Sequence, residues 1–70
     1  MDFILPPIVE KRLHIILSLI RNNNHLSANQ IAQKLEITLR TVQRDLQRLK
    51  DRHKIIRHGS TKTGYWQIIE

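Results

Sequence analysis

A chain of 70 residues and 8.3 kDa is one small domain, and with 40% apolar residues it can enclose no deep internal pocket. The absence of cysteine excludes a disulfide framework, a thiolate metal site and a cysteine nucleophile, and it fits a reducing compartment, so we expect a cytoplasmic protein. The net charge of +6 and the pI near 10.6 indicate a polyanionic partner, and neither a membrane span nor a signal peptide is recognisable.

Residues 1–7 are expected to form an extended arm or linker, because the pair Pro6 and Pro7 disfavours a helix. A first helix is predicted from Ile8 to about Asn22, where apolar residues recur at steps of three and four. This spacing places them on one side of the helix, which should face the core. They are Val9, Leu13, Ile16, Leu17 and Ile20.

Two N-caps mark the start of the next two helices. Ser27, with Gln30 three residues later, forms a capping box, so a second helix should follow Ser27. Thr38 is the second N-cap, and a third helix is predicted from Leu39 to about Arg52. The residues of the third helix expected to face the core are Val42, Leu46 and Leu49.

Two strands are predicted after the third helix, over 55–58 and 65–69, because these stretches have strand composition and turn residues lie between them. In the second strand Trp66 and Ile68 share one face, whereas Gln67 lies on the other. We therefore expect a hairpin whose Trp66 face meets the core.

The side of the third helix opposite the core has the chemistry of a DNA-reading surface. Arg pairs with guanine and Gln with adenine in the major groove, and a helix N-terminus favours nearby phosphate. A solvated face would instead mix Glu with Lys, and the only acid of this helix before Asp51 is Asp45, which lies off the outward face and could hold Arg48 or another Arg. The outward cluster is Arg40, Gln43, Arg44 and Gln47, with Thr41 and Arg48 at its edge.

The surplus positive charge of the chain lies in the range 38–62, which includes this helix, the first predicted strand and part of the turn that follows it. That range has eight Lys and Arg residues and two Asp residues, whereas residues 1–37 have four cations and three acids. A basic run often forms only a solvated face. Here the sign, the spacing and the position after an N-cap all favour contact with DNA.

Two short helices joined by a tight turn and followed by a basic hairpin form a mainly α fold with a small β-hairpin, the three-helix winged helix-turn-helix. From Leu26 to Leu49 the chain resembles the DeoR-type helix-turn-helix, in the stretch LSANQIAQKLEITLRTVQRDLQRL. Its tail is similar to the wing of modules at the C-termini of RecG-like, ATP-binding transcriptional regulators, in the stretch HGSTKTGYWQI. The resemblance covers roughly residues 10 to 69, and residues 8–70 are taken as one winged helix domain.

The resemblance implies sequence-specific binding of double-stranded DNA by a bacterial transcriptional regulator or by the DNA-binding module of one. The outward face of the third helix would read bases, Thr41 would contact phosphate, and Lys62 would be the cation of the wing. The residues predicted to bind DNA are Ser27, Thr38, Leu39, Arg40, Thr41, Gln43, Arg44, Gln47, Arg48 and Lys62.

The sequence departs from the family pattern at four residues. Glu36 and His53 stand where such domains usually have Gly, at positions where a left-handed backbone is common, which costs about 1 kcal/mol each. Leu39 replaces a usually polar residue at the start of the third helix, which suggests contact with a thymine methyl group or with a partner protein. Lys54 replaces Leu or Ile and leaves the entry to the wing less tightly packed.

The first helix has a second apolar stripe, nearly opposite its core-facing side. The stripe consists of Ile8, Ile15 and Leu19, with the stem of Arg12 between them. A surface helix normally has one such stripe, so something is expected to cover the second one. The arm or the wing strands could do so, and so could a second copy of the chain or a larger parent protein. The alternative function is therefore a protein-interaction or dimerisation winged helix within a larger ATP-binding, RecG-like protein.

No enzymatic role and no cofactor is expected. The sequence has no Ser, His and acid set for a nucleophile and no phosphate-binding Gly loop, and its three aromatic residues are too few for a platform that stacks single-stranded bases. None of the four histidines has the spacing of a metal ligand: His14, His25, His53 and His58.

Overall fold

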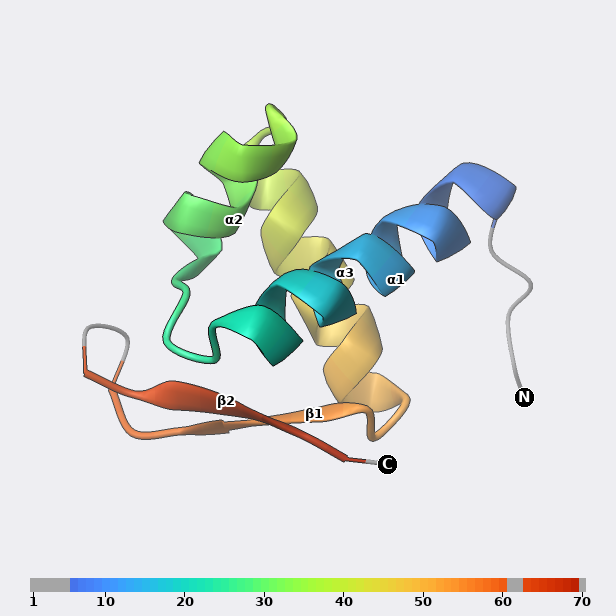
Figure 1. Ribbon diagram of the computed structural model, residues 1–70. Coiled ribbons are helices and arrows are strands. Elements are labelled where there is room, and N and C mark those ends of the chain that lie inside the picture. Colours follow the sequence, from blue (N-terminus) through green and yellow to red (C-terminus); the bar gives the residue numbers. More distant parts are fainter. Residues whose placement is uncertain (1–5, 61–62, 70) are drawn as a thin grey trace.

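The computed structural model of this protein describes residues 6–60 and 63–69. It has three helices, α1 (Pro7–Asn22), α2 (Ala28–Leu35) and α3 (Leu39–Asp51), and an antiparallel hairpin of β1 (Ile55–His58) and β2 (Tyr65–Ile68). In Figure 1, α1 crosses α3, α2 lies beside the first half of α3, and the hairpin runs along one side of the helices. The predicted mainly α fold with a small β-hairpin is confirmed.

Helix α1 begins one residue earlier than predicted, at Pro7. A proline is tolerated at the first helical position because its missing N–H would have no partner inside the helix anyway. The carbonyl of Pro6 accepts hydrogen bonds from the backbone N–H groups of Val9 (2.9 Å) and Glu10 (3.1 Å), and these close the first turn. Of the predicted arm, residues 1–5 lie outside the described residues.

Both predicted caps are present at the starts of α2 and α3. The backbone N–H of Gln30 donates to Ser27 Oγ (3.2 Å), and the backbone N–H of Ser27 donates to Gln30 Oε1 (2.8 Å), which completes the capping box. At the start of α3 the N–H of Thr41 donates to Thr38 Oγ1 (3.2 Å). The two caps therefore define the residues at which α2 and α3 begin.

Helices α2 and α3 are each followed by a residue with a left-handed backbone, as the comparison with the family pattern predicted. Glu36 has φ 55° and His53 has φ 58°. A backbone hydrogen bond between residues five apart closes each of these turns. After α2, the N–H of Ile37 donates to the carbonyl of Ala32 (3.1 Å), and after α3, the N–H of Lys54 donates to the carbonyl of Leu49 (2.9 Å). These bonds define the turns that lead into α3 and into the hairpin.

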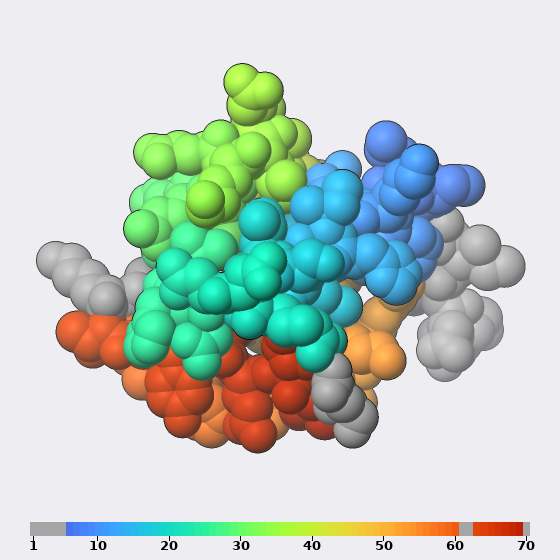
Figure 2. Space-filling view, in the orientation of Figure 1, coloured from blue at the N-terminus to red at the C-terminus, as the bar shows by residue number. Residues whose placement is uncertain are grey.

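The hydrophobic core lies where the three helices meet the inner face of the hairpin. Trp66 is 6% exposed and Ile68 is half-buried, whereas Gln67 is exposed, so the predicted orientation of the second strand is confirmed. In Figure 2 the hairpin forms the lower edge of the molecule, below α1. The buried apolar residues are Leu13, Ile16, Ile20, Leu26, Ile31, Ala32, Val42, Leu46, Leu49, Ile55 and Trp66.

Two hydrogen bonds from Trp66 attach the hairpin to the segment that joins α1 to α2. Its backbone N–H donates to the carbonyl of Asn24 (2.8 Å), and its indole Nε1–H donates to the carbonyl of Leu26 (3.0 Å). Near the hairpin turn a Cβ atom on Gly64 would lie 2.2 Å from the carbonyl oxygen of His58, so only glycine fits there. The wing is therefore anchored through the backbone and the side chain of Trp66, and its turn requires glycine at residue 64.

Candidate nucleic-acid interface

The outward face of α3 presents four polar side chains to solvent. Arg40, Gln43, Arg44 and Gln47 are all exposed, so the prediction that they point away from the core is confirmed, while their contact with DNA stays a prediction. Within residues 6–60 and 63–69, no acidic side chain forms an ion pair with Arg40 or Arg44. Their charge therefore adds to the partial positive charge of the helix N-terminus.

Small polar groups border this face at the helix starts. Thr38 is exposed and its Oγ1 lies 2.9 Å from Oγ1 of Thr41, which is half-buried. Leu39, between them, is 36% exposed and lies on the surface beside Arg40. The hydroxyl of Ser27, which accepts its capping bond, keeps a proton that can be donated to a phosphate oxygen.

Two members of the predicted set have partners on their own helix. Gln47 Nε2 donates to Asp51 Oδ1 (3.0 Å), and Arg48 Nη1 donates to Asp45 Oδ1 (2.8 Å). Asp45 is fully buried, so the prediction that it holds an arginine in place is confirmed for Arg48. Arg48 thus differs from Arg40 and Arg44, because an acid inside the fold fixes its guanidinium.

Ion pairs also fix α1 against α3. Arg12 donates to both carboxylate oxygens of Asp45, from Nε to Oδ2 and from Nη2 to Oδ1 (3.0 Å), and these bonds raise the pKa of Arg12 although desolvation opposes them. Arg52 forms a two-point pair with Glu10, Nη1 to Oε1 (2.7 Å) and Nη2 to Oε2 (2.9 Å). Chiefly through these hydrogen bonds, Arg52 holds the pKa of Glu10 below its usual value. These pairs therefore connect α1 to the middle of α3 and to the residue that follows its last turn.

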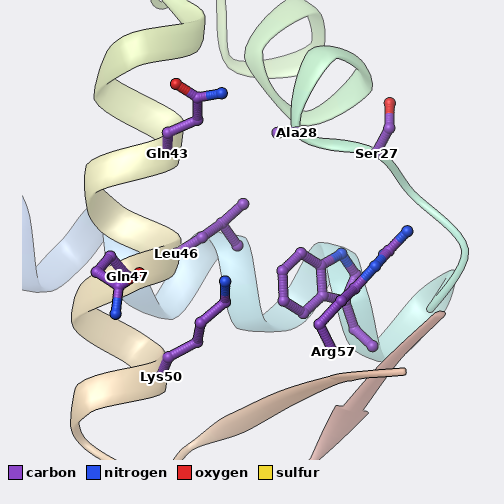
Figure 3. A pocket seen from close by; sticks show the side chains of 8 residues that line it. Ser27, Ala28, Gln43, Leu46, Gln47, Lys50 and Arg57 are labelled. Carbon is purple, nitrogen blue, oxygen red and sulfur yellow. The ribbon is translucent and has the colours of Figure 1, made fainter. Parts of the chain in front are cut away.

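A cleft of about 280 Å³ lies between α3, the start of α2 and the hairpin (Figure 3). Lys50 enters it from the last turn of α3, and Arg57 enters it from β1. Sequence reasoning did not select these two cations. The spacing of Gln43, Gln47 and Lys50 along one side of a helix was a usable signal for Lys50. No local signal places Arg57 there. The cleft is lined by Ser27, Ala28, Gln43, Leu46, Gln47, Lys50, Arg57 and Trp66.

In a comparison with known families, residues 11–65 match the helix-turn-helix (HTH) domain. The chain belongs to the HTH domain family. The match spans α2, the turn and α3 as well as most of α1 and the start of the hairpin's second strand. It supports DNA binding through the helix-turn-helix, and the three helices with their hairpin fit a winged helix form of this domain. No curated protein and no solved structure matches the chain.

The second apolar stripe of this HTH domain is interrupted. Ile8 is 69% exposed and Ile15 is 46% exposed, but Leu19 is half-buried and packs against the core. The guanidinium of Arg12 is bound to Asp45 of the same chain. The exposed apolar surface of α1 thus consists of Ile8 and Ile15, and its contact with a partner stays a prediction.

Lys62, the predicted wing cation, lies outside the described residues. Within the part of the chain that the structure describes, no group of three or more His, Asp or Glu side chains could hold a metal ion. No described helix is long and apolar enough to cross a membrane. HTH domains that bind DNA are typically not enzymes.

Proposed function

We propose that this HTH domain binds double-stranded DNA in a sequence-specific manner, as a bacterial transcriptional regulator of the DeoR-like or RecG-like kind or as the DNA-binding module of one. Helix α3 lies in the major groove, and the wing lies on the sugar-phosphate backbone. The protein acts in the cytoplasm, where the chromosome is accessible to it.

One observation carries this proposal: the arginines of the first two turns of α3 are exposed and have no acidic partner among the described residues. The acids of α3 bind other groups, since Asp45 pairs with Arg12 and Arg48, and Asp51 accepts from Gln47. The guanidinium groups of Arg40 and Arg44 are thus available to bind base edges or phosphates.

The base-reading role is tested with Arg44→Ala, measured by fluorescence anisotropy on a selected duplex and on random duplexes. We expect the variant to lose about 1 to 3 kcal/mol on the selected duplex and to discriminate less between sequences. Lys62→Ala should instead weaken binding to all duplexes by a similar factor, because phosphate contacts have no sequence information. Equal losses on selected and random duplexes for both variants would contradict these roles.

Salt dependence tests the electrostatic part of the proposal. With about four to six phosphate contacts, log K plotted against log salt should fall with a slope of about −4 to −5. A slope near zero would mean that the basic surface does not meet phosphates.

A second candidate function is favoured by the exposure of Ile8, Ile15 and Leu39. In this alternative the winged helix docks onto a second copy of the chain or onto a larger ATP-binding parent protein. Titration of random duplex separates the two candidates. Micromolar binding at low salt that disappears at high salt supports DNA binding, and no binding at low salt supports the docking function.

A further inference from the structure

The cleft between α3 and the wing brings together cations that are distant in sequence and borders the base-reading face. Figure 3 shows Gln43, Gln47 and Lys50 following one another down α3, and Arg57 approaching from the hairpin. Gln43 and Gln47 also belong to the outward face of α3, so the cleft continues that face toward the wing. No acidic side chain of the described residues lines the cleft.

Trp66 holds both cations of the cleft. Its ring centroid lies 5.5 Å from Lys50 Nζ and 4.8 Å from Arg57 Cζ, within the range of cation–π attraction. Arg57 is the cross-strand partner of Trp66, and its Nη2 donates to the carbonyl of Ser60 (2.8 Å). Because the ring is 6% exposed and its Nε1–H is bound to Leu26, it provides a rigid support for both side chains.

Lys50 and Arg57 bring two positive charges to one cleft whose described lining has no acid, and this arrangement attracts an anion. The anion that suits this place is a phosphodiester, because the cleft lies beside the side chains expected to enter the major groove. In duplex DNA a phosphate strand runs along the edge of that groove.

We propose that the cleft is a clamp for the DNA backbone, in which Lys50 and Arg57 contact phosphates beside the groove that α3 occupies. This inference rests on the proposed function and deepens it. It makes the base of the wing a backbone contact, in addition to Lys62, the wing cation predicted from the sequence. Trp66 acts as a positioning residue that orients the two cations without touching DNA.

The test compares salt slopes for a fluorescently labelled random duplex between about 50 and 200 mM salt. Lys50→Gln and Arg57→Gln should each reduce the steepness of the slope by about 1, and the double variant by about 2, on every duplex sequence alike. The charge-retaining variants Lys50→Arg and Arg57→Lys should keep the wild-type slope, which separates lost charge from altered folding. Lys11→Gln is the matched control, since Lys11 is exposed on α1 and does not line the cleft. Its slope should equal that of the wild type.

A second measurement uses Trp66, the only tryptophan of the chain. Duplex binding should change its emission in a saturable way, because phosphates bind the two cations that lie against the ring, and this change should be absent in the double variant. Inorganic phosphate at matched ionic strength should not reproduce it. If inorganic phosphate alone gives the same saturable change, the cleft is a site for free anions and the clamp is wrong.

A wild-type protein that binds no duplex at low salt overturns the proposed function together with the clamp. A wild-type protein that binds with a slope near −4 to −5, while both glutamine variants keep that slope, overturns the clamp alone.

Discussion

Asp45 is the side chain whose replacement should destabilise the fold most clearly, and we expect Asp45→Asn to weaken it strongly. The carboxylate is 0% exposed and accepts three hydrogen bonds, two from Arg12 and one from Arg48. Asparagine keeps one acceptor oxygen but places an NH2 group, which is a donor, next to guanidinium donors, so at least one charge-assisted hydrogen bond is lost. In addition, Arg12 and Arg48 lose the negative charge that balances them.

The expected loss is about 3 to 5 kcal/mol, the range for breaking a buried ion pair. A domain of this length has a total free energy of unfolding of about 4 to 10 kcal/mol, so the variant should lose about 30% of it or more. Urea unfolding followed by the fluorescence of Trp66 measures this directly, because the ring is buried in the folded state and the chain has no second tryptophan.

Asp51→Asn is the matched control, because it makes the same chemical change on the same helix at an exposed residue whose described contact is Gln47. It should change the free energy of unfolding by less than about 0.5 kcal/mol. A loss for Asp45→Asn below about 1 kcal/mol would refute the reasoning, since that is the size of an exposed pair. The loss should not depend on protein concentration, because Arg12 and Asp45 belong to the same chain.

Further predictions concern single turns and one titrating group. Glu36→Gly should raise the free energy of unfolding by about 1 kcal/mol, since glycine adopts the left-handed backbone of that turn without strain; a destabilised variant would contradict this. Gly64→Ala should distort the hairpin and weaken duplex binding while α-helical circular dichroism is kept, because its Cβ would meet the carbonyl of His58 at 2.2 Å; unchanged binding would show that the turn adapts. The pKa of Glu10 is lowered in the folded state, so its pair with Arg52 stabilises the fold above pH 4.5 and is lost as the pH falls through the folded-state pKa. The stability difference between wild type and Glu10→Gln should therefore shrink below pH 4.5 in urea titrations, and a difference that stays constant with pH would contradict it.

The sequence predicted the helices and the wing strands because their signals are local. The capping atoms of Ser27 and Thr38 lie within three residues of the N–H groups that they accept, so residue type and spacing suffice to locate the helix starts. Two ends differ from the predicted ones by one residue: α3 ends at Asp51 instead of about Arg52, and β2 ends at Ile68 instead of residue 69. The ends of helices and strands are less certain because they depend on a single backbone hydrogen bond.

The outward face of α3 was also predictable, since a period of 3.6 residues separates its polar side from the side that is buried. The sequence indicated that Asp45 could hold an arginine, but it could not decide which arginine that would be. Arg40 and Arg44 have no acidic partner among the described residues, whereas Arg48 is bound to a buried carboxylate, although all three are arginines of one helix.

The sequence by itself therefore determined the order of the elements, their caps, their core-facing sides and the basic character of α3. Tertiary structure decided that Arg12 reaches Asp45 across 33 residues and that Lys50 and Arg57 meet at Trp66. The physical reason is that capping and periodicity act within one turn of chain. Ion pairs and cation–π contacts depend on where distant segments meet, and the packing of the whole core sets those positions.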